Sequence, residues 1–152
     1  MQLLRLAGLL AAALLSCACS DSRQSLDELG TSLVTLPNGK DIKVEVLTNP
    51  QDMLRGMMFR DKLDMDRGML FIHGSPGKYP YWMYQVRIPL DILWMARNHS
   101  VVEISANTPP CPSKKASECP NFGGHEEAAY VLELAGGAAA KYGIKVGDTI
   151  NF

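Results

Sequence analysis

The segment LDILWMA at residues 90–96 decides the fold, because it is apolar on both faces apart from one acid, Asp91. A run in which both alternating sets of side chains are apolar indicates a central strand that is covered on both sides. Short apolar runs at residues 68–72 (GMLFI), 101–104 (VVEI) and 129–134 (AYVLEL) predict further strands around it.

Two more strands are predicted before this central group. Residues 33–36 (LVTL) are strand-like, and residues 42–46 (IKVEV) alternate apolar and charged side chains as a half-buried strand does. Asn38-Gly39 lies between them and suits the positive φ angles of a tight hairpin turn.

Two short helices and one last strand complete the predicted domain. Asn49 can cap a helix that starts at Pro50 and ends at Gly56, and a second helix over residues 137–142 is expected to stop at Gly143. Residues 74–77 are expected to form a loop, and residues 146–152 a final strand. The pattern predicts a single mainly β domain over residues 31–152, with about seven or eight short strands at sandwich-like intervals.

The first residues have the layout of a secretory signal. One positive charge, Arg5, precedes an uninterrupted apolar run from Leu6 to Leu15, which is too short to span a bilayer. We interpret residues 1–16 as a signal peptide. The polar residues 17–30 are interpreted as a flexible tether.

The segment Leu14-Leu15-Ser16-Cys17 resembles a bacterial lipoprotein box. The resemblance implies cleavage before Cys17 and a diacylglycerol on its sulfur, and Ala18 behind it implies an outer-membrane destination facing the periplasm. An ordinary signal peptide with a nearby Ala-x-Ala-type cut is the alternative. Cys19 fits the box less well, because Ser16 stands where a leucine is wanted.

The charge and the hydropathy of the chain argue against a nucleic-acid partner and against a later membrane-spanning segment. Loss of Arg5 with the signal peptide changes the formal net charge from −1 to −2, and no basic block occurs, so a nucleic-acid partner is not expected. No later apolar run is long enough to cross a membrane, so the lipid anchor is the expected membrane contact. We expect a monomer.

Cys111 and Cys119 enclose the short loop CPSKKASEC. In an exported protein such a pair predicts a disulfide, and the loop is long enough to bring the two Cα atoms within bridging distance. A metal site with His125 is the alternative, but paired zinc ligands are usually about two to four residues apart. No metal and no cofactor are expected.

Three segments resemble the domain-of-unknown-function 192 family. They are residues 56–71 (GMMFR to GMLF), residues 82–92 (WMYQVRIPLDI) and residues 130–148 (YVLEL to GD), in the family's order and spacing. The resemblance covers nearly all of residues 31–152. It implies a compact antiparallel β-sandwich or barrel of jelly-roll type, and the family brings no established activity.

Four positions depart from the family pattern. The family usually has Leu at Met57, Asn at Gln85, Thr or Val at Val86 and Pro at Ala135. Gln85 keeps the amide but moves it one methylene further out. Any contact that the family's amide makes to a loop or a ligand is therefore in doubt in this chain.

Asp91 is the strongest candidate for chemistry, because all its near neighbours are apolar. A carboxylate in such a place must be paired, hydrogen-bonded or protonated. It either marks a functional site, or it is structural and accepts backbone N–H groups or pairs with Arg60 or Arg87.

The aromatic segment 79–84 (YPYWMY) and the methionines have two interpretations each. The aromatic side chains either line a ligand cleft or belong to the core, and core is favoured for Trp82. The methionines lack the close spacing of a copper site and are interpreted as core residues. His73, His99 and His125 lie in or beside loops without ligand spacing.

Two functional classes follow. The first is a lipid-anchored envelope protein that binds a small ligand or an envelope component, with ligand-binding residues Asp91, Arg60, Trp82, Gln85 and Arg87. The second is a small periplasmic enzyme of hydrolase type that uses Asp91 with an arginine. We favour the binding module, because no nucleophile–base pair can be identified in the sequence.

Overall fold

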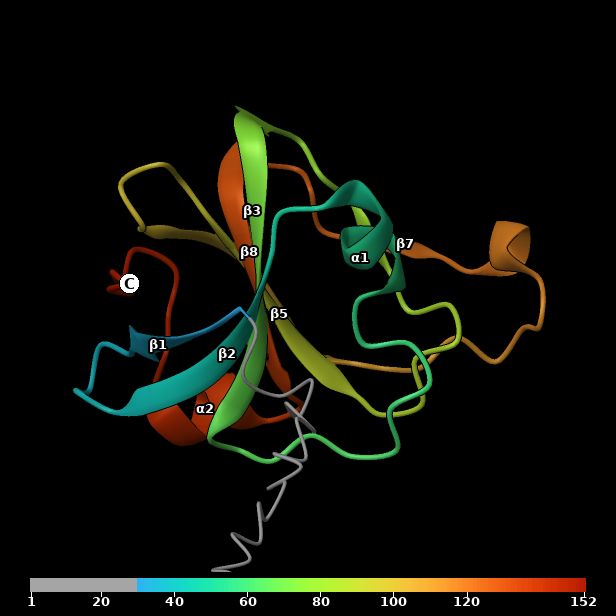
Figure 1. Cartoon of the computed structure of the whole chain (residues 1–152), viewed down its shortest axis with the longest axis horizontal. Helices are drawn as coiled ribbons and strands as arrows, with labels where there is room; N and C mark the ends of the chain where they lie inside the picture. The colour runs from blue at the N-terminus through green and yellow to red at the C-terminus, as the bar shows by residue number, and fades with distance from the viewer. Residues whose placement is uncertain (1–29) are drawn as a thin grey trace, which may run out of the picture.

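The computed structural model describes residues 30–152, which fold around one six-stranded sheet (Figure 1). The predicted signal peptide, the predicted lipidation residue Cys17 and nearly all of the predicted tether lie outside the described residues. The strand order in the sheet is β1-β2-β3-β8-β5-β6. The strands are β1 (Thr31–Thr35), β2 (Asp41–Leu47), β3 (Arg67–Gly77), β5 (Leu90–Met95), β6 (Val101–Thr108) and β8 (Ala128–Ala135).

The remaining elements are short. A second sheet pairs β4 (Tyr81–Trp82) with β7 (Asn121–Phe122). The helices are α1 (Pro50–Arg55), α2 (Ala138–Tyr142) and the 3-10 turn η1 (Ala116–Glu118). No helix within residues 30–152 is long and apolar enough to cross a membrane.

The predicted mainly β class with two short helices is confirmed. The sheet differs from an all-antiparallel one at one pair, because β2 and β3 run parallel. The connection between them carries α1 and returns the chain in the same direction, as parallel pairing requires. The sheet is also open, since β1 and β6 are its edges.

The C-terminal segment touches both edges of the sheet without forming the predicted strand. Asn151 bridges to Thr35 at the end of β1, and Thr149 bridges to Ser100 just before β6. The segment turns at Gly147, where φ is 95°, and it forms only these single bridges. At the other end, β3 continues through residues 74–77, which were expected to be a loop, and it shifts register there against β8.

The predicted helix signals operate as expected. The Asn49 side chain accepts the N–H of Gln51 at 2.8 Å, Pro50 occupies the first turn, and the chain leaves α1 at Gly56 with φ 41°. Gly143 ends α2 with φ 70°, a conformation that favours glycine.

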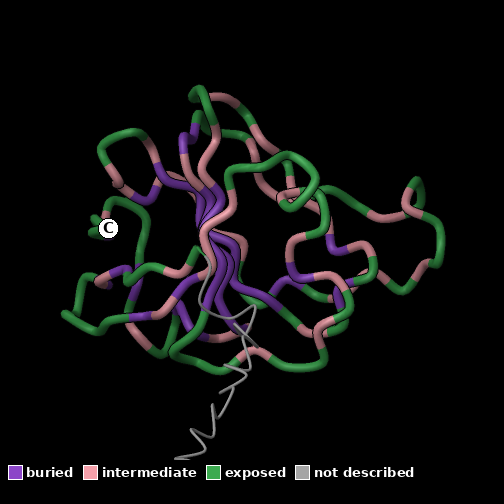
Figure 2. The backbone as a smooth tube through the Cα atoms, viewed as in Figure 1, coloured by how far each residue is buried: buried purple, intermediate pink, exposed green. Residues whose placement is uncertain are grey.

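Both faces of the sheet are buried, which accounts for the apolar runs (Figure 2). On the first face, which we call the α2 face, α2 covers a cluster that includes Val44, Leu70, Leu93 and Leu132. On the second face, the α1 face, the chain from α1 to β5 covers a cluster that includes Met69, Phe71, Ile92, Trp94 and Val131. The two covering layers lie on opposite sides of the sheet in Figure 1.

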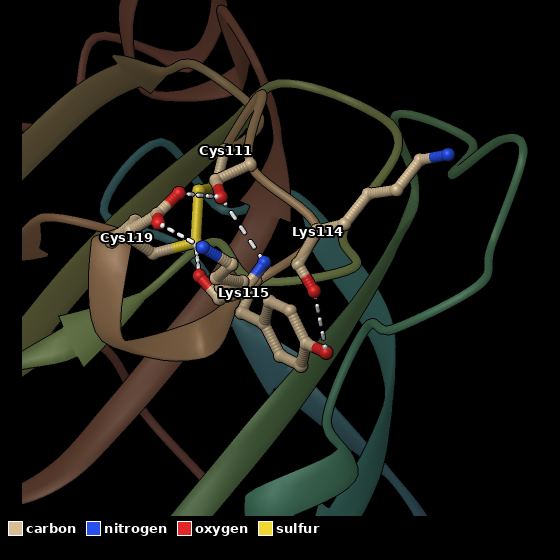
Figure 3. The surroundings of a disulfide bond; sticks show 7 residues. Cys111, Lys114, Lys115 and Cys119 are labelled. Atoms are coloured by element: carbon tan, nitrogen blue, oxygen red, sulfur yellow. Dashed lines mark hydrogen bonds and ion pairs between the residues drawn. A yellow bond between two sulfur atoms is a disulfide. The ribbon is translucent and has the colours of Figure 1, made fainter.

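The predicted disulfide joins Cys111 and Cys119, whose Cα atoms are 5.6 Å apart (Figure 3). It closes an exposed arm between β6 and β7. The arm is tied to the β4 region, because Cys111 N donates to Met83 O at 3.2 Å and the Tyr84 hydroxyl donates to Lys114 O at 3.3 Å. The bridge therefore helps to place β7 beside β4.

Candidate functional site

Asp91 is fully buried on the α2 face and is satisfied by backbone N–H groups. Its Oδ1 accepts from Asn107 N at 2.6 Å and from Gly137 N at 3.1 Å, and its Oδ2 accepts from Ala139 N at 2.6 Å. The carboxylate thus holds the start of α2 and the end of β6 against β5. This is the structural one of the two roles predicted for it.

Strand alternation separates Asp91 from the other predicted site residues. Asp91 shares its face with Leu93, whereas Ile92 and Trp94 point to the opposite face. Arg60 lies on that opposite face, where its guanidinium makes a bidentate pair with Glu45 at 2.6 and 2.7 Å. The structure therefore does not bring Asp91 together with Arg60, and the hydrolase arrangement loses its acid.

The other three predicted residues are on the α1 side of the domain. Arg87 pairs with Asp61 at 2.8 Å on the surface. Gln85 adopts φ 56°, and its carbonyl accepts the Phe59 N–H at 2.9 Å. Trp82 is half-buried in β4 and lines a cleft, as the ligand interpretation of the aromatic segment requires.

This aromatic cleft has a volume of about 350 Å³ and lies between α1 and β4. The residues that line it include Met53, Leu54, His73, Tyr79, Tyr81 and Trp82. Its volume and its mixture of aromatic and polar groups are typical of small-molecule sites.

Ring contacts and close packing hold the cleft in shape. The His73 ring stacks on Tyr79 at 3.6 Å, and Tyr81 packs edge-on against Phe71 at 5.1 Å. Behind them, a Cβ on Gly123 would lie 2.3 Å from the Trp94 ring, and one on Gly124 would lie 2.4 Å from Pro80 N. Only glycine allows the chain before β8 to pass so close to the cleft wall.

Glu133 is a buried acid on the α1 face. It lies in β8 between Met69 of β3 and Ile92 of β5, and its exposed fraction is 4%. Its Oε2 has no hydrogen-bond partner among residues 30–152. Burial raises the pKa of the Glu133 carboxyl to about 8, and the nearby Arg60 guanidinium opposes part of that rise.

A small cavity connects Glu133 to the aromatic side of the domain. It has a volume of about 20 Å³, and Glu133, Phe71, Tyr81, Trp82 and Tyr84 are among the residues around it. A cavity above roughly 10–15 Å³ holds one water-sized group. The small cavity shares Met53, Leu54, Tyr81 and Trp82 with the aromatic cleft.

The titrating groups of the cleft influence each other. Burial, followed by the charges of Glu133 and Tyr79, raises the pKa of Tyr81. The Tyr81 hydroxyl lies 3.3 Å from His73 Nε2, and burial lowers the pKa of His73. Glu133, Tyr81 and His73 are therefore uncharged near neutral pH, and the exposed Arg55 is the charged side chain that lines the small cavity.

A second, more polar groove of about 430 Å³ lies beyond that pair. Lys43, Glu45, Arg60, Asp64 and Arg67 are among the residues that line it. Charges of both signs alternate around it, and it has no aromatic wall. It therefore defines no ligand class as clearly as the aromatic cleft does.

Glu133 was not among the site residues predicted from the sequence, although the sequence carries a signal for it. Glu133 is the one acid in the apolar run of β8, just as Asp91 is the one acid in β5. An isolated acid in an apolar strand is the same pattern that marked Asp91 as a candidate. Among the described residues, no group of three histidine, cysteine or acidic side chains could hold a metal ion.

The fold and the site define a small mainly β domain with a buried carboxyl group behind an aromatic cleft. Residues 33–152 match the model of the DUF192 family, which is described as uncharacterised, and the chain belongs to this family. The predicted resemblance is thereby confirmed.

Two solved structures are similar to the chain. A protein of unknown function from Novosphingobium aromaticivorans DSM 12444 is 30% identical with a TM-score of 0.71, over 80% of this chain and 85% of that one. A protein from Sinorhizobium meliloti 1021, described as a proposed transcription regulator, is 30% identical with a TM-score of 0.67, over 78% and 89% of the two chains. A comparison with curated proteins gives no significant match.

Proposed function

We propose that this protein is a lipid-anchored, periplasm-facing binding module whose small ligand occupies the aromatic cleft. The observation that carries the proposal is the cleft itself: about 350 Å³ of space with aromatic walls and a buried, unsatisfied carboxyl group behind it. Sites that bind small molecules combine apolar walls with a few placed polar groups in this way.

Binding is favoured over catalysis by the state of the acids. Both oxygens of Asp91 accept backbone N–H groups and the side chain is fully buried, so this residue is not accessible to a substrate. Within residues 30–152, Glu133 Oε2 accepts no hydrogen bond, so it forms no nucleophile–base pair with a histidine, serine or cysteine through that oxygen. A module that recognises its ligand without changing it needs neither.

The aromatic cleft can be tested with a ligand screen that reads tryptophan fluorescence. The chain has two tryptophans: Trp82 is half-buried in the cleft, whereas Trp94 is fully buried in the core. Ligands of the cleft should change the emission of the full chain. Their affinity, measured by calorimetry because Trp82→Ala lacks the reporter, should fall at least tenfold in that variant. Phe152→Ala removes an aromatic ring outside the cleft and serves as the control. A ligand whose affinity is unchanged in Trp82→Ala would contradict the proposal.

The envelope location rests on the segment that ends at Cys17. Lipidated protein should carry a mass increase that disappears in Cys17→Ser, and that variant should be released in soluble form. Intact-mass measurement of membrane-extracted protein tests this, because firm anchoring needs more than one acyl chain. An unmodified Cys17 in mature protein would refute the anchor while leaving the cleft proposal intact.

A further inference from the structure

We infer that the ligand of the aromatic cleft carries a primary ammonium group, which enters the small cavity and pairs with Glu133. The inference rests on the proposed function, because it names the chemical class of the ligand that the cleft would bind. The proposed site has two parts. The small cavity holds the charged head, and the aromatic cleft holds the rest of the molecule.

The dimensions of the two spaces fit this division. The small cavity, at about 20 Å³, admits one water-sized group, and an ammonium group is of that size. The aromatic cleft, at about 350 Å³, accommodates a chain or a ring. Tyr81 and Trp82 line both spaces, so a ligand that bends past these two side chains reaches Glu133 from the surface.

The chemistry at the inner end favours a cation. Glu133 Oε2 has no partner among the described residues, and a buried carboxyl oxygen without a partner is costly. An ammonium group supplies both the missing hydrogen bond and a compensating charge. An anionic ligand would be repelled once Glu133 ionises.

The aromatic walls point to the same class. Tyr81, Trp82 and Tyr84 border the small cavity with Glu133, and the faces of aromatic rings attract cations. Trp82 and Tyr84 are neighbours, with ring centroids 5.6 Å apart. Rings of this kind beside a carboxylate form an environment that suits an ammonium group better than a hydroxyl group.

The charged groups around Glu133 leave a place for one more positive charge. Arg60, which makes a bidentate pair with Glu45 of β2, is a cation that acts on Glu133. Tyr81 faces Glu133 from β4, with His73 of β3 behind it, and Arg55 of α1 lies exposed at the rim. An ammonium ligand bound to ionised Glu133 would offset the negative charge that ionisation places in this buried site.

Binding should release one proton. Burial keeps Glu133 protonated at neutral pH, since its pKa is raised to about 8. An alkylammonium ligand that binds the carboxylate therefore displaces the carboxyl proton into solvent, and the ligand keeps its own. Well below pH 8 the affinity should rise about tenfold per pH unit, as release of one proton requires, and the rise should level off as the pH approaches 8.

Matched probes test the inference on the full chain. The probes are 2-phenylethylamine and 2-phenylethanol, which share a skeleton and differ in the ammonium group. Calorimetry at pH 6, 7 and 8 should show that the amine binds at least tenfold more tightly than the alcohol at pH 8. Binding of the amine should release about one proton at pH 6 and about half a proton at pH 8. The Glu133→Gln variant should lose both the preference and the pH dependence. Glu127→Gln changes an exposed acid just before β8 and should alter neither.

A third probe tests whether the head enters the small cavity. The N,N,N-trimethyl derivative of 2-phenylethylamine has a head too large for about 20 Å³ and should bind at least tenfold more weakly than the amine. Equal affinity of these two cations would overturn the inference, because the head would then lie outside the cavity.

Two further outcomes separate this inference from the proposed function. Equal binding of amine and alcohol that Trp82→Ala abolishes would overturn the ammonium assignment and leave the cleft as a ligand site. Absence of binding by every probe at millimolar concentration would overturn the ammonium assignment, and the fluorescence screen with other ligand classes would then decide the proposed function on its own.

Discussion

The buried acid of β8 makes the stability of the domain depend on pH in a predictable direction. The folded-state pKa of Glu133 is raised from the ordinary 4.5 to about 8, so the folded protein holds this proton more tightly than the unfolded chain does. The stabilisation is complete below pH 4.5 and is lost as the pH rises through 8. Each pKa unit corresponds to about 1.4 kcal/mol, so the whole loss is about 5 kcal/mol.

The effect of Glu133 on stability should be measured above pH 6.5, because below this pH the titration of His73 changes the stability in the opposite direction. Burial lowers the pKa of His73, so its contribution to stability grows as the pH rises toward its unfolded value of 6.5 and is constant above it. Between pH 6.5 and 8.5 the Glu133 contribution should fall by about 2 kcal/mol. A loss of this size is a large part of the stability of an ordinary domain.

Urea unfolding of the full chain at pH 6.5, 7.5 and 8.5, without reductant, measures this loss. The wild type should lose about 2 kcal/mol of unfolding free energy across the window. Glu133→Gln keeps the shape of the protonated acid but cannot ionise, so its stability should stay nearly constant. Glu127→Gln, an exposed control, should follow the wild type. A flat wild-type profile, or an equal slope in Glu133→Gln, would refute the assignment of a raised pKa to this side chain.

Three further changes have expected outcomes that can be measured by the same unfolding assay. Asp91→Asn weakens the acceptance of three backbone N–H groups and should lower the free energy of unfolding by about 3 kcal/mol at pH 7. A decrease of less than about 1 kcal/mol would show that these hydrogen bonds are dispensable. Gly123→Ala places a Cβ 2.3 Å from the Trp94 ring at a backbone φ of +59°. The overpacking should lower the free energy of unfolding by about 1–3 kcal/mol and change the near-UV circular dichroism spectrum of Trp94. An unchanged spectrum would contradict the close contact. The double variant Cys111→Ala, Cys119→Ala should lose about 2–3 kcal/mol and exchange amide hydrogens faster in residues 109–122, with β5 and β8 still protected; faster exchange throughout the central strands would contradict a local role for the bridge.

Most of the individual strands and helix ends could be predicted from residues that are close together in the sequence. The apolar run at residues 90–96 became the fully buried β5, because a strand covered on both faces needs apolar side chains of both parities. Asn49 and Gly143 marked helix ends through their backbone preferences, which depend on near neighbours only. The Cys111–Cys119 pairing was likewise predicted from a short loop and from the expectation that the chain is exported.

The pairing of strands that are distant in the sequence was harder to predict. The parallel pairing of β2 with β3 depends on where the connection through α1 brings the chain, and the alternation in residues 42–46 is the same for either direction. The ends of residues 146–152 reach both edge strands, but only single bridges form there. Sequence patterns report the faces of a strand and do not report its partners.

Asp91 and Glu133 show why the candidate site was harder to predict than the fold. Each is the one acid in an apolar, central strand, so each must be satisfied or protonated. Asp91 points to the face where the start of α2 presents backbone donors, and two of these come from residues 46 and 48 positions later in the chain. Glu133 points to the opposite face, among methionine and aromatic side chains that offer no such donors.

The difference between a structural acid and a site acid therefore arises from the far side of the fold. Strand parity assigns an acid to a face, and this much can be inferred from its apolar neighbours once one face is known. Whether that face supplies N–H groups depends on a distant chain reversal, here the Gly136-Gly137 turn before α2. Without those donors, Asp91 and Glu133 would both be buried acids without hydrogen-bond partners, and either could bind a ligand. Because the donors are in place at Asp91, Glu133 Oε2 is the buried side-chain oxygen of residues 30–152 that still lacks a partner, and we expect a ligand to supply it.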